Sequence, residues 1–449
     1  MKNSIDLFLL RFISYSVCLI PFVLIFSNSI ADIIVVITAT YFIYKSIKNN
    51  DWLWLKEQWV KICFLIYFWL IISSFFSYNQ ELALSRSISW IRFIIFAASL
   101  QFLFFTQKKF EKKLIIFIFF AIIYVNIEML IEYFTNYSLY SRFLETYFDK
   151  DPFAGGSHRI SGPFKDAPKS GLYLSYFIFP TFFGLINYFY LKNKSNLFIF
   201  LLIFIILNLF LIKISGHRGS VLSIIISSFL MIFFLFFRKN IKIFIYSLII
   251  LFISCFILYN SNSFLKNRIK NSLIDKTFNE ISNYSKSAYG SLSITAFKMS
   301  LSNPIFGVGL KNYRIACEKD EFLSEGHKGS GYGVSPWKGH YNIELKKYYE
   351  ATCSSHPHNL YLTWLSETGI PGLLFFIIFL IIIIIKINQD KNILLKNILF
   401  LGILTSLIPK FIPMMPSLNF FSNWNAVTVW FLIGWLLSYF SKNKKINDF

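Results

Sequence analysis

The chain alternates between long apolar runs and short polar connections over nearly its whole length. A run of about 18 apolar residues is long enough to cross a bilayer as a helix. We place about twelve such spans, with centres near Leu19, Val36, Phe68, Ala97, Ile123, Ile178, Ile205, Ser228, Ile250, Ile378, Leu401 and Leu432. The first run has no cleavage-site pattern and leads almost directly into the second, so it is interpreted as a retained helix. The pattern predicts an all-α polytopic membrane protein.

The longest polar stretch separates the ninth and tenth spans, from about residue 260 to 357. We expect this long loop to fold as a cap onto the membrane helices. The sequence shows no internal repeat, low-complexity linker or soluble domain, so residues 1–449 are predicted to form a single membrane-embedded domain that includes the 260–357 subregion. Two other connections matter on the same side: one at about 134–169, and a tight turn at Gly216-His217-Arg218-Gly219.

Composition supports the membrane class and explains the charge. The chain is 55% hydrophobic and only 15% charged, with a formal net charge of +21. That charge could suggest a nucleic-acid partner, but Lys and Arg cluster in alternate connections, which is the positive-inside pattern. It predicts that both termini are cytoplasmic, and it argues against nucleic acid. The same orientation places all six histidines outside or at the outer edge of the membrane: His158, His217, His327, His340, His356 and His358.

The cysteines fit an oxidising outer compartment. Cys18, Cys63 and Cys255 lie within apolar runs and are expected to be packing residues. Cys317 and Cys353 both lie in the long loop, where an even pair can form a disulfide that stabilises by roughly 3–4 kcal/mol. The alternatives are two free thiols, or a metal site that uses Cys353 with His356.

The segment Ser354-Ser355-His356-Pro357-His358-Asn359 ends the long loop just before the tenth span. Proline is favoured at the first helical position, so the sequence predicts a helix from Pro357, with His356 as its cap and His358 in its first turn. The positive end of a helix disfavours a protonated imidazole, so His358 is expected to be neutral, as a general base requires. The alternative is that both histidines only cap a helix. Their spacing keeps them off one helical face, so we expect different roles for them.

Arginines near the outer face are candidates for binding anions. Arg218 lies between two glycines at the level of the lipid phosphates, and its planar fork suits phosphate oxygens; the alternative is an arginine that snorkels to the interface. Arg159 precedes the sixth span, and its alternative is a loop anchor. The Gly307-Val308-Gly309 segment is interpreted as a turn that directs Arg314, whose alternative is a solvated cation. This Gly-x-Gly is no dinucleotide motif, because no strand–turn–helix unit surrounds it.

Other polar residues near the tenth span are given supporting roles. Glu367 is about 180° around a helix from His358, so it is expected to buttress the loop or to pair with a basic residue there. His217 and Asn359 are also expected to support the site. Arg86 and Arg92 lie in or beside the fourth span, and the sequence leaves their place open.

Motifs that the sequence lacks argue against an ATP-driven pump and against metal-dependent chemistry. The sequence has no Walker motif and no acidic cluster at an outer helix end, so a metal-dependent route to a lipid-linked leaving group lacks ligands. We therefore expect neither a metal nor a cofactor. Several arginines with a neutral histidine, facing outward at lipid-phosphate height, suit a transferase whose donor is a lipid diphosphate. The arginines would hold the diphosphate, and the histidine would deprotonate the attacking hydroxyl.

Several features together resemble the bacterial O-antigen ligase and polymerase family. They are the spans, the long outer loop between the ninth and tenth, and three motifs: Ser215-Gly216-His217-Arg218-Gly219, Pro304-Ile305-Phe306-Gly307-Val308-Gly309, and His356-Pro357-His358-Asn359-Leu360-Tyr361-Leu362 followed by Glu367-Thr368-Gly369-Ile370-Pro371-Gly372. The resemblance implies a metal-independent, inverting glycosyl transfer at the periplasmic face of the inner membrane. The implied donor is a glycan on undecaprenyl diphosphate. In ligases the acceptor is the lipid A–core oligosaccharide.

The resemblance also assigns roles to residues. The loop-end histidine of the family corresponds to His358, and its short-turn arginine corresponds to Arg218. The family has a second arginine in the long loop; none occurs around Ser287-Ala288-Tyr289-Gly290, so Arg314 is taken in its place, with His356 and Arg159 supporting.

Three alternatives to a ligase stay open. One is a polymerase that lengthens the lipid-linked glycan, and another is transfer to a protein. The third belongs to a different class, a polysaccharide transporter without catalysis. It is disfavoured because the spans are poor in ionisable residues and rich in aromatic ones.

Overall fold

The fold is described from a computed structural model. It describes residues 2–107, 109–140, 143, 160–164, 169–189, 194–236, 242, 245, 249, 288–322, 341–342, 347–348, 353–389, 397–413 and 415–447. The α-helices in these residues are α1 (Lys2–Phe26), α2 (Asn28–Asn49), α3 (Gln58–Ser74), α4 (Gln80–Ser99), α5 (Phe110–Thr135), α7 (Ser170–Phe189), α8 (Lys194–Ile214), α9 (Arg218–Phe236), α13 (Ala288–Ser302), α14 (Tyr313–Ala316), α15 (Leu360–Gln389), α17 (Ile398–Leu407) and α18 (Asn423–Asn447). The short elements are the 3-10 turns η1 (Leu53–Lys56), η3 (Gly162–Phe164), η7 (Asp320–Phe322) and η8 (Ile408–Phe411), the π-helical segment η2 (Leu100–Phe104), and the paired strands β1 (Tyr341–Asn342) and β2 (Lys347–Tyr348).

The helical, multi-span class predicted from the sequence is confirmed. Within the described ranges, seven helices are long and apolar enough to cross a membrane, namely α1, α2, α4, α5, α7, α9 and α15. Shorter apolar helices are α3, the second half of α8, and α17 with η8. All the predicted span centres except Ile250 fall in helices of this structure, and Ile250 lies outside the described residues. The total of about twelve spans stays a prediction.

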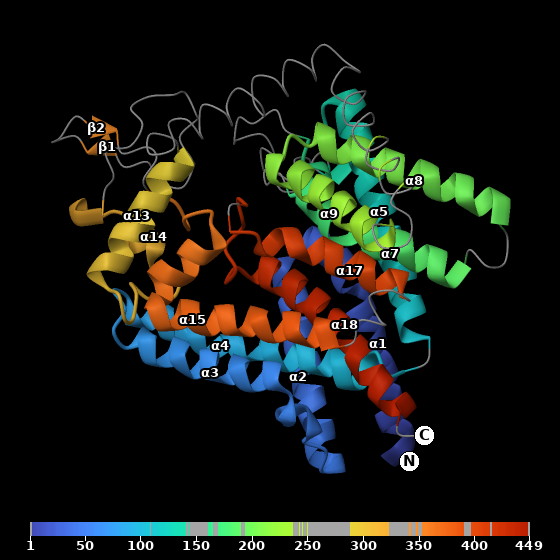
Figure 1. The fold of residues 1–449 in the computed structure, drawn as a ribbon, viewed down its shortest axis with the longest axis horizontal. Helices are drawn as coiled ribbons and strands as arrows, with labels where there is room; N and C mark the ends of the chain where they lie inside the picture. Colours follow the sequence, from blue (N-terminus) through green and yellow to red (C-terminus); the bar gives the residue numbers. More distant parts are fainter. Residues whose placement is uncertain are drawn as a thin grey trace.

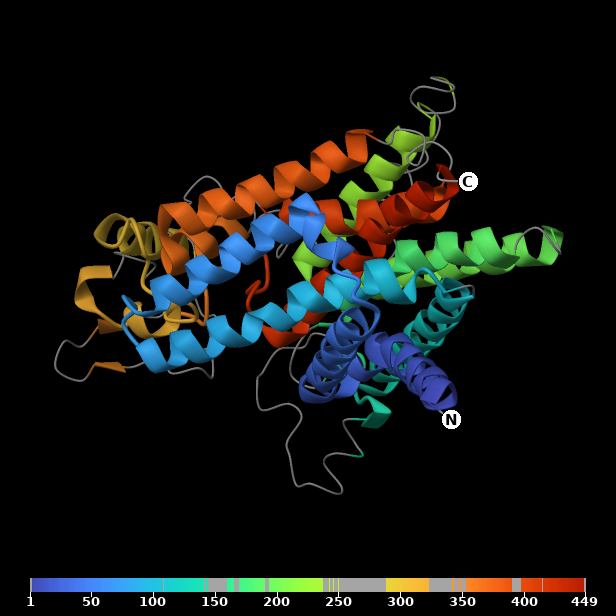
Figure 2. The ribbon, with the colours of Figure 1, turned by 90° about the horizontal axis from the view of Figure 1, so that it is seen from below.

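The helices form two groups joined by a buried helix (Figure 1). Helices α3, α4 and α15 pack together in one group, and α5, α7, α8, α9 and α17 form the other. Helix α18 packs on α2, α4 and α17. Its Trp430 and Trp435 are among the largest fully buried side chains of the molecule. Figure 2 shows the same arrangement from below, with α15 and α3 running side by side.

Charged groups inside the helical bundle have polar partners. Arg92 of α4 makes a bidentate ion pair with Asp32 of α2, with its Nε 2.7 Å from Oδ1 and its Nη2 3.2 Å from Oδ2. Its Nη2 also donates to the side-chain oxygen of Asn423. Glu111 accepts hydrogen bonds from Trp435 and Tyr439 of α18. Such pairing is expected, because a charge in a bundle is costly unless it faces protein or water. Arg92 therefore links α4 to α2 and to the start of α18.

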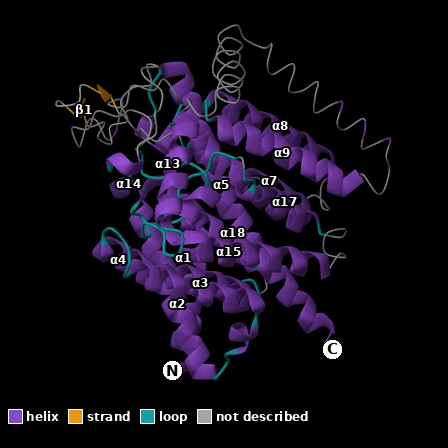
Figure 3. Cartoon of the chain, turned by 60° about the vertical axis from the view of Figure 1, so that its left-hand side comes forward, coloured by secondary structure: helices purple, strands orange, loops and turns teal. Residues whose placement is uncertain are grey.

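A cap of short elements lies at the end of the molecule away from both termini (Figures 1 and 3). It contains α13, α14 and the strand pair, and it has a small hydrophobic core of its own around Tyr313, Cys317 and Phe322. Helix α13 packs on α15, which connects this cap to the membrane helices. The cap therefore gathers polar groups of the long loop near the start of α15.

Candidate functional site

Helix α15 begins at Leu360, so the predicted start at Pro357 is wrong. Asn359 is the cap: its Oδ1 accepts hydrogen bonds from the amides of Tyr361 and Leu362, at 3.0 and 3.1 Å. An asparagine cap satisfies amides that the first helical turn cannot pair, and a histidine at position 356 is too early to do so. His358 lies one residue before this cap with a φ of 54°, a left-handed conformation that places it outside the helix.

The two histidines touch each other, contrary to the expectation from a shared helix. Their ring centroids are 4.1 Å apart. The Nε2 of His356 lies 3.0 Å from the carbonyl oxygen of Ser417, to which it donates, and its Nδ1 lies 2.9 Å from the hydroxyl of Ser355. The His358 ring meets the edge of Tyr289 of the cap, and its Nε2 lies 3.5 Å from the hydroxyl of Ser354. His356 is thus fixed at both nitrogens, whereas His358 has a looser contact.

Burial keeps both imidazoles neutral. It lowers the pKa of His358 to about 4 and, for His356, which is only 4% exposed, well below the usual value. His358 and the positive charges of Lys311 and Arg314 lower the pKa of His356 further. Desolvation penalises the charged imidazolium, and nearby cations do the same. At neutral pH the half-buried His358 is therefore a neutral imidazole, able to accept a proton.

Arg218 is the first residue of α9 and is held there by its neighbour. The Nδ1 of His217 accepts a hydrogen bond from the amide of Ser220 at 3.1 Å, so His217 caps the helix. The supporting role expected for His217 therefore has a specific contact. A cation such as Arg218 at a helix start opposes the helix dipole, which an anion bound there would offset.

One segment connects the Arg218 turn with the histidines. Gly219 packs against Pro416, whose carbonyl oxygen would lie 3.5 Å from a Cβ added at position 219. The next residue, Ser417, accepts from His356 and donates its amide to the carbonyl of His358 at 2.9 Å. Asn359 donates to the carbonyl of Pro413 at 2.7 Å. This segment was not predicted to be part of the site, because nothing in its composition marks it as polar or catalytic.

The second part of the site is the docking of the loop 303–312 onto a kink in α15. Inside that helix Gly369 has a φ of 71° and a ψ of −176°, and the amides of Val308 and Gly309 donate to the carbonyls of Ser366 and Glu367, at 2.8 and 3.1 Å. The backbones are in direct contact: a Cβ added at Gly369 would lie 1.9 Å from the carbonyl oxygen of Ile305. The Pro304–Gly309 motif and the Glu367–Gly372 motif of the sequence therefore contact each other directly. We call this contact the loop joint.

Glu367 braces this joint from within α15. It is fully buried, and its Oε2 accepts a hydrogen bond from the backbone amide of Lys311 at 2.9 Å. The carboxylate contacts the loop that leads to Arg314, in the direction expected from its position on the helix.

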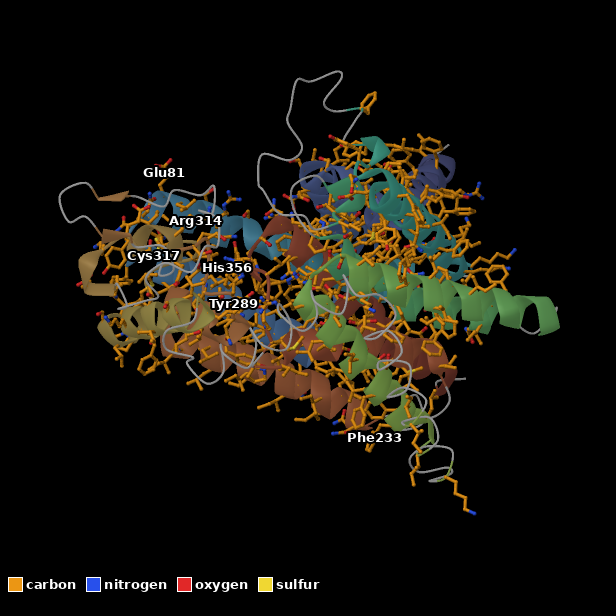
Figure 4. The ribbon with its side chains drawn as sticks, turned by 90° about the horizontal axis from the view of Figure 1, so that it is seen from above. Glu81, Phe233, Tyr289, Arg314, Cys317 and His356 are labelled. Carbon is orange, nitrogen blue, oxygen red and sulfur yellow. A yellow bond between two sulfur atoms is a disulfide. The ribbon has the colours of Figure 1, made fainter. Side chains whose placement is uncertain are left out.

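Cations gather at this joint. Arg314 lies on α14 with its side chain exposed, close enough to affect the protonation of His356. Lys311 is 8% exposed, and Arg86 of α4 lies near it. Figure 4 shows Arg314, His356, Tyr289 and Cys317 at the same end of the molecule. Lys311 was not predicted to be a site residue, and the place of Arg86 was left open. Only the Gly307-Val308-Gly309 segment, which ends two residues before Lys311, indicated a fixed backbone position.

A disulfide joins the loop to the histidine segment. Cys317, at the end of α14, is bonded to Cys353, with their Cα atoms 5.1 Å apart. The link ties the element that carries Arg314 to the residues just before Ser354. Across the residues whose placement is described, no group of three His, Cys, Asp or Glu side chains could hold a metal ion.

Arg159 lies outside the described residues, as do His158, His327 and His340. The residues that follow Arg159 are anchored to α5: the amides of Ser161 and Gly162 donate to the carboxylate of Glu132. The role of Arg159 stays a prediction.

The fold and the site define a multi-span helical membrane protein with two contacting histidines, which Pro416 and Ser417 link to the turn of Arg218 and near which Lys311 and Arg314 lie. The family model described as O-antigen ligase matches residues 199–377, from within α8 to within α15. This match confirms the resemblance to the O-antigen ligase family, and the matched range includes Arg218, Lys311, Arg314, His356, His358 and Glu367. No curated protein matches the chain.

Proposed function

We propose that the protein is an O-antigen ligase-like glycosyltransferase of the bacterial inner membrane. It would move a glycan from undecaprenyl diphosphate to the lipid A–core oligosaccharide at the periplasmic face. The observation that carries the proposal is the neutral, half-buried His358, in ring contact with His356, near which Lys311 and Arg314 lie, all within the range matched by the family model. The end of the molecule that carries this site lies away from both termini, which agrees with cytoplasmic termini and a periplasmic site (Figure 1).

In the proposed reaction His358 acts as the general base. The acceptor hydroxyl oxygen attacks the anomeric carbon of the donor sugar and gives its proton to His358. The bond from that carbon to the diphosphate oxygen breaks, and undecaprenyl diphosphate leaves with the electron pair. Attack from the face opposite the leaving group inverts the anomeric centre. General-base catalysis of this kind contributes about 10²–10⁴-fold.

Arg218 and Arg314 would stabilise the leaving diphosphate. Guanidinium groups bind phosphate oxygens through paired hydrogen bonds. Because they would neutralise the negative charge of the leaving diphosphate, no strong general acid is needed. His356, fixed by Ser355 and Ser417, would position the ring of His358 through their contact. No metal is required in this scheme, so transfer should continue in the presence of a chelator.

The test is transfer by the full-length chain in nanodiscs, with a labelled lipid-linked oligosaccharide as donor. His358→Ala should abolish transfer, and Arg218→Ala should lower it by roughly 10–100-fold, the loss of a hydrogen bond to a charged group, while each variant inserts and keeps its thermal stability. Lys319→Gln, an exposed cation over the ring of Tyr78, is the control and should transfer normally. Full activity of a well-folded His358→Ala variant would overturn the mechanism, and loss in chelator that a divalent ion restores would overturn its metal independence.

Lipopolysaccharide from a deletion strain tests the acceptor. A strain without a ligase should accumulate long lipid-linked chains. A strain that instead attaches single repeat units would identify a polymerase, and unchanged lipopolysaccharide with a lost protein glycan would identify a protein acceptor.

A further inference from the structure

Lys410 is a half-buried cation of the helical bundle that the proposed reaction does not use. It lies on η8, which follows α17, and α17 packs on both α7 and α9 (Figure 1). Its Nζ is 2.7 Å from the hydroxyl oxygen of Ser175 on α7, 3.1 Å from that of Ser223 on α9, and 4.5 Å from the centroid of the Tyr176 ring. An ammonium group inside a bundle is costly unless polar groups or an aromatic face surround it, and Lys410 has both.

The two serine hydroxyls accept hydrogen bonds from Lys410. Ser223 donates its own hydroxyl proton to the carbonyl of Gly219 at 2.7 Å, and Ser175 donates its proton to the carbonyl of Leu172, also at 2.7 Å. Because a hydroxyl has only one proton, these oxygens can only present lone pairs to the ammonium group. Two of the three ammonium protons of Lys410 are therefore committed to helices α7 and α9.

The residues that follow Lys410 are held at the start of α15. The hydroxyl of Tyr361 donates to the carbonyl of Phe411 at 2.6 Å, and Asn359 forms an isolated β-bridge with Pro416. The residue after that bridge bonds to both histidines of the candidate site. The chain from η8 to the histidine pair is therefore connected by hydrogen bonds along its length.

The same lysine is connected to the turn of Arg218 through one hydroxyl. Ser223 accepts from Lys410 and donates to Gly219, the residue after Arg218. Gly219 also packs against the segment that follows η8. These contacts form a closed ring that begins and ends at Lys410, with Arg218 beside one part of it and His358 beside another.

We propose that Lys410 is a positioning residue that fixes the separation of Arg218 and His358 during transfer. The inference rests on the proposed function for the roles of these two residues. An inverting transfer has the attacking hydroxyl and the leaving diphosphate on opposite faces of the sugar, so the base and the cation must be held at one separation. A displacement of about 1 Å can lower the rate by about 10²-fold. Lys410 acts through Ser223 and η8, and it does not touch the substrate.

Transfer kinetics of the full-length chain in nanodiscs test this role. Lys410→Met keeps the length of the side chain and removes its donors. It should lower kcat by roughly 10–100-fold and leave the KM of the lipid-linked donor nearly unchanged, because orientation is lost while binding is kept. Ser223→Ala, a milder change, should lower kcat by about 10-fold, the loss of one charge-assisted hydrogen bond. The double variant should be about as active as Lys410→Met, because both changes break the same connection.

Lys386→Met is the matched control. Lys386 is also a half-buried lysine of the bundle, paired with Glu57 and near the ring of Phe440 in the last turn of α15. Its loss should lower the midpoint of thermal unfolding and leave kcat and KM unchanged. In Lys410→Met, a rise in donor KM at constant kcat would assign Lys410 to substrate binding. That result, or a wild-type kcat in the folded variant, would overturn the proposal.

Hydrogen exchange gives a readout that needs no glycan transfer. The amide of Ser417 donates to the carbonyl of His358 at 2.9 Å. In Lys410→Met this amide should exchange about 10-fold faster, because local opening costs less once η8 is no longer anchored, and Lys386→Met should leave it unchanged. If the wild type transfers no glycan while the exchange still responds to Lys410→Met, the proposed function fails and the anchoring by Lys410 stands. Wild-type exchange at Ser417 in Lys410→Met would overturn the anchoring itself.

Discussion

The two cationic sides of the histidine pair are built in different ways. Arg218 lies in a turn whose geometry is local: His217 caps the helix that Arg218 begins, within three residues of sequence. Lys311 and Arg314 lie in a loop whose shape depends on contacts with α15, some 56 residues later in the chain. The turn of Arg218 is therefore determined by its local sequence. The position of Lys311 and Arg314 depends on the contact of the long loop with α15.

This difference bears on how the site can fail. Replacement of the Arg218 side chain is expected to leave the cap of α9 in place, because that cap is the hydrogen bond between His217 and Ser220. A change at the loop joint moves a whole cationic cluster, because its backbone amides, Glu367 and the kink at Gly369 are one hydrogen-bonded unit. The Arg218 side should therefore tolerate substitution structurally, and the Lys311 side should not.

The largest expected effect comes from removing both cations. Arg218→Gln and Arg314→Gln should each lower kcat/KM by roughly 10–100-fold, since a hydrogen bond to a charged group contributes about 1.5–3 kcal/mol. The double variant should lose about the product of the two factors, because the residues sit on separate segments. Steady-state transfer kinetics measure this. If kcat/KM of the double variant is no lower than that of the less active single variant, the two cationic sides act as one contact and are not independent.

Substitution of one glycine on each side tests whether the loop joint depends on tertiary contacts more than the Arg218 turn does. Gly369→Ala should unfold the joint, because its Cβ would lie 1.9 Å from the carbonyl oxygen of Ile305 and its φ is 71°. A cost above about 3 kcal/mol is expected from strain and clash together. Gly219→Ala is the matched control: the nearest atom, on His217, would be 3.3 Å away, and alanine suits a helix. Thermal unfolding in nanodiscs compares them, and equal midpoints for the two variants would contradict the difference.

The disulfide should matter only to the loop side. Replacing Cys317 and Cys353 together by serine removes a closed loop with a sequence separation of 36, worth about 3–4 kcal/mol in the chain-entropy model. Limited proteolysis should then cut the cap first, while pyrophosphate binding through Arg218 persists. Faster cleavage near residues 215–220 than in the cap would contradict this assignment.

The pH dependence gives the smallest effect. Burial lowers the pKa of His358 to about 4, so its base form persists well below the usual value for histidine. Transfer should stay nearly constant from about pH 8 to 5 and fall as the pH approaches 4. Folding stability should decline earlier, from about pH 6.5 to about pH 4, because in this range the unfolded chain takes up a proton at His358 that the folded chain does not. A rate that halves near pH 6.5 in stable protein would show that His358 is not desolvated.

Much of the fold was predictable, because a bilayer constrains the apolar runs strongly. The helices over the predicted span centres follow from length and hydropathy alone. Histidine and arginine positions were also recognisable, because polar residues stand out against apolar runs. The start of α15 was not, because Pro357 gave a stronger local signal than Asn359, whose cap depends on where His358 turns the chain. The contact between the two histidines was missed for the same reason.

The sequence by itself determined the membrane class, the position of the long loop and the identity of His358 and Arg218 as candidates, because each depends on hydropathy or on a short motif. Only the tertiary structure decided which groups surround them. Asn312 donates a hydrogen bond to the carbonyl of Asn79, 233 residues away in sequence, and this sets the loop of Lys311 against the start of α4. Ser417 reaches His356 from beyond the tenth span. These contacts join distant segments by hydrogen bonds from side chains to backbone carbonyls, which leave no periodic pattern in the amino-acid sequence.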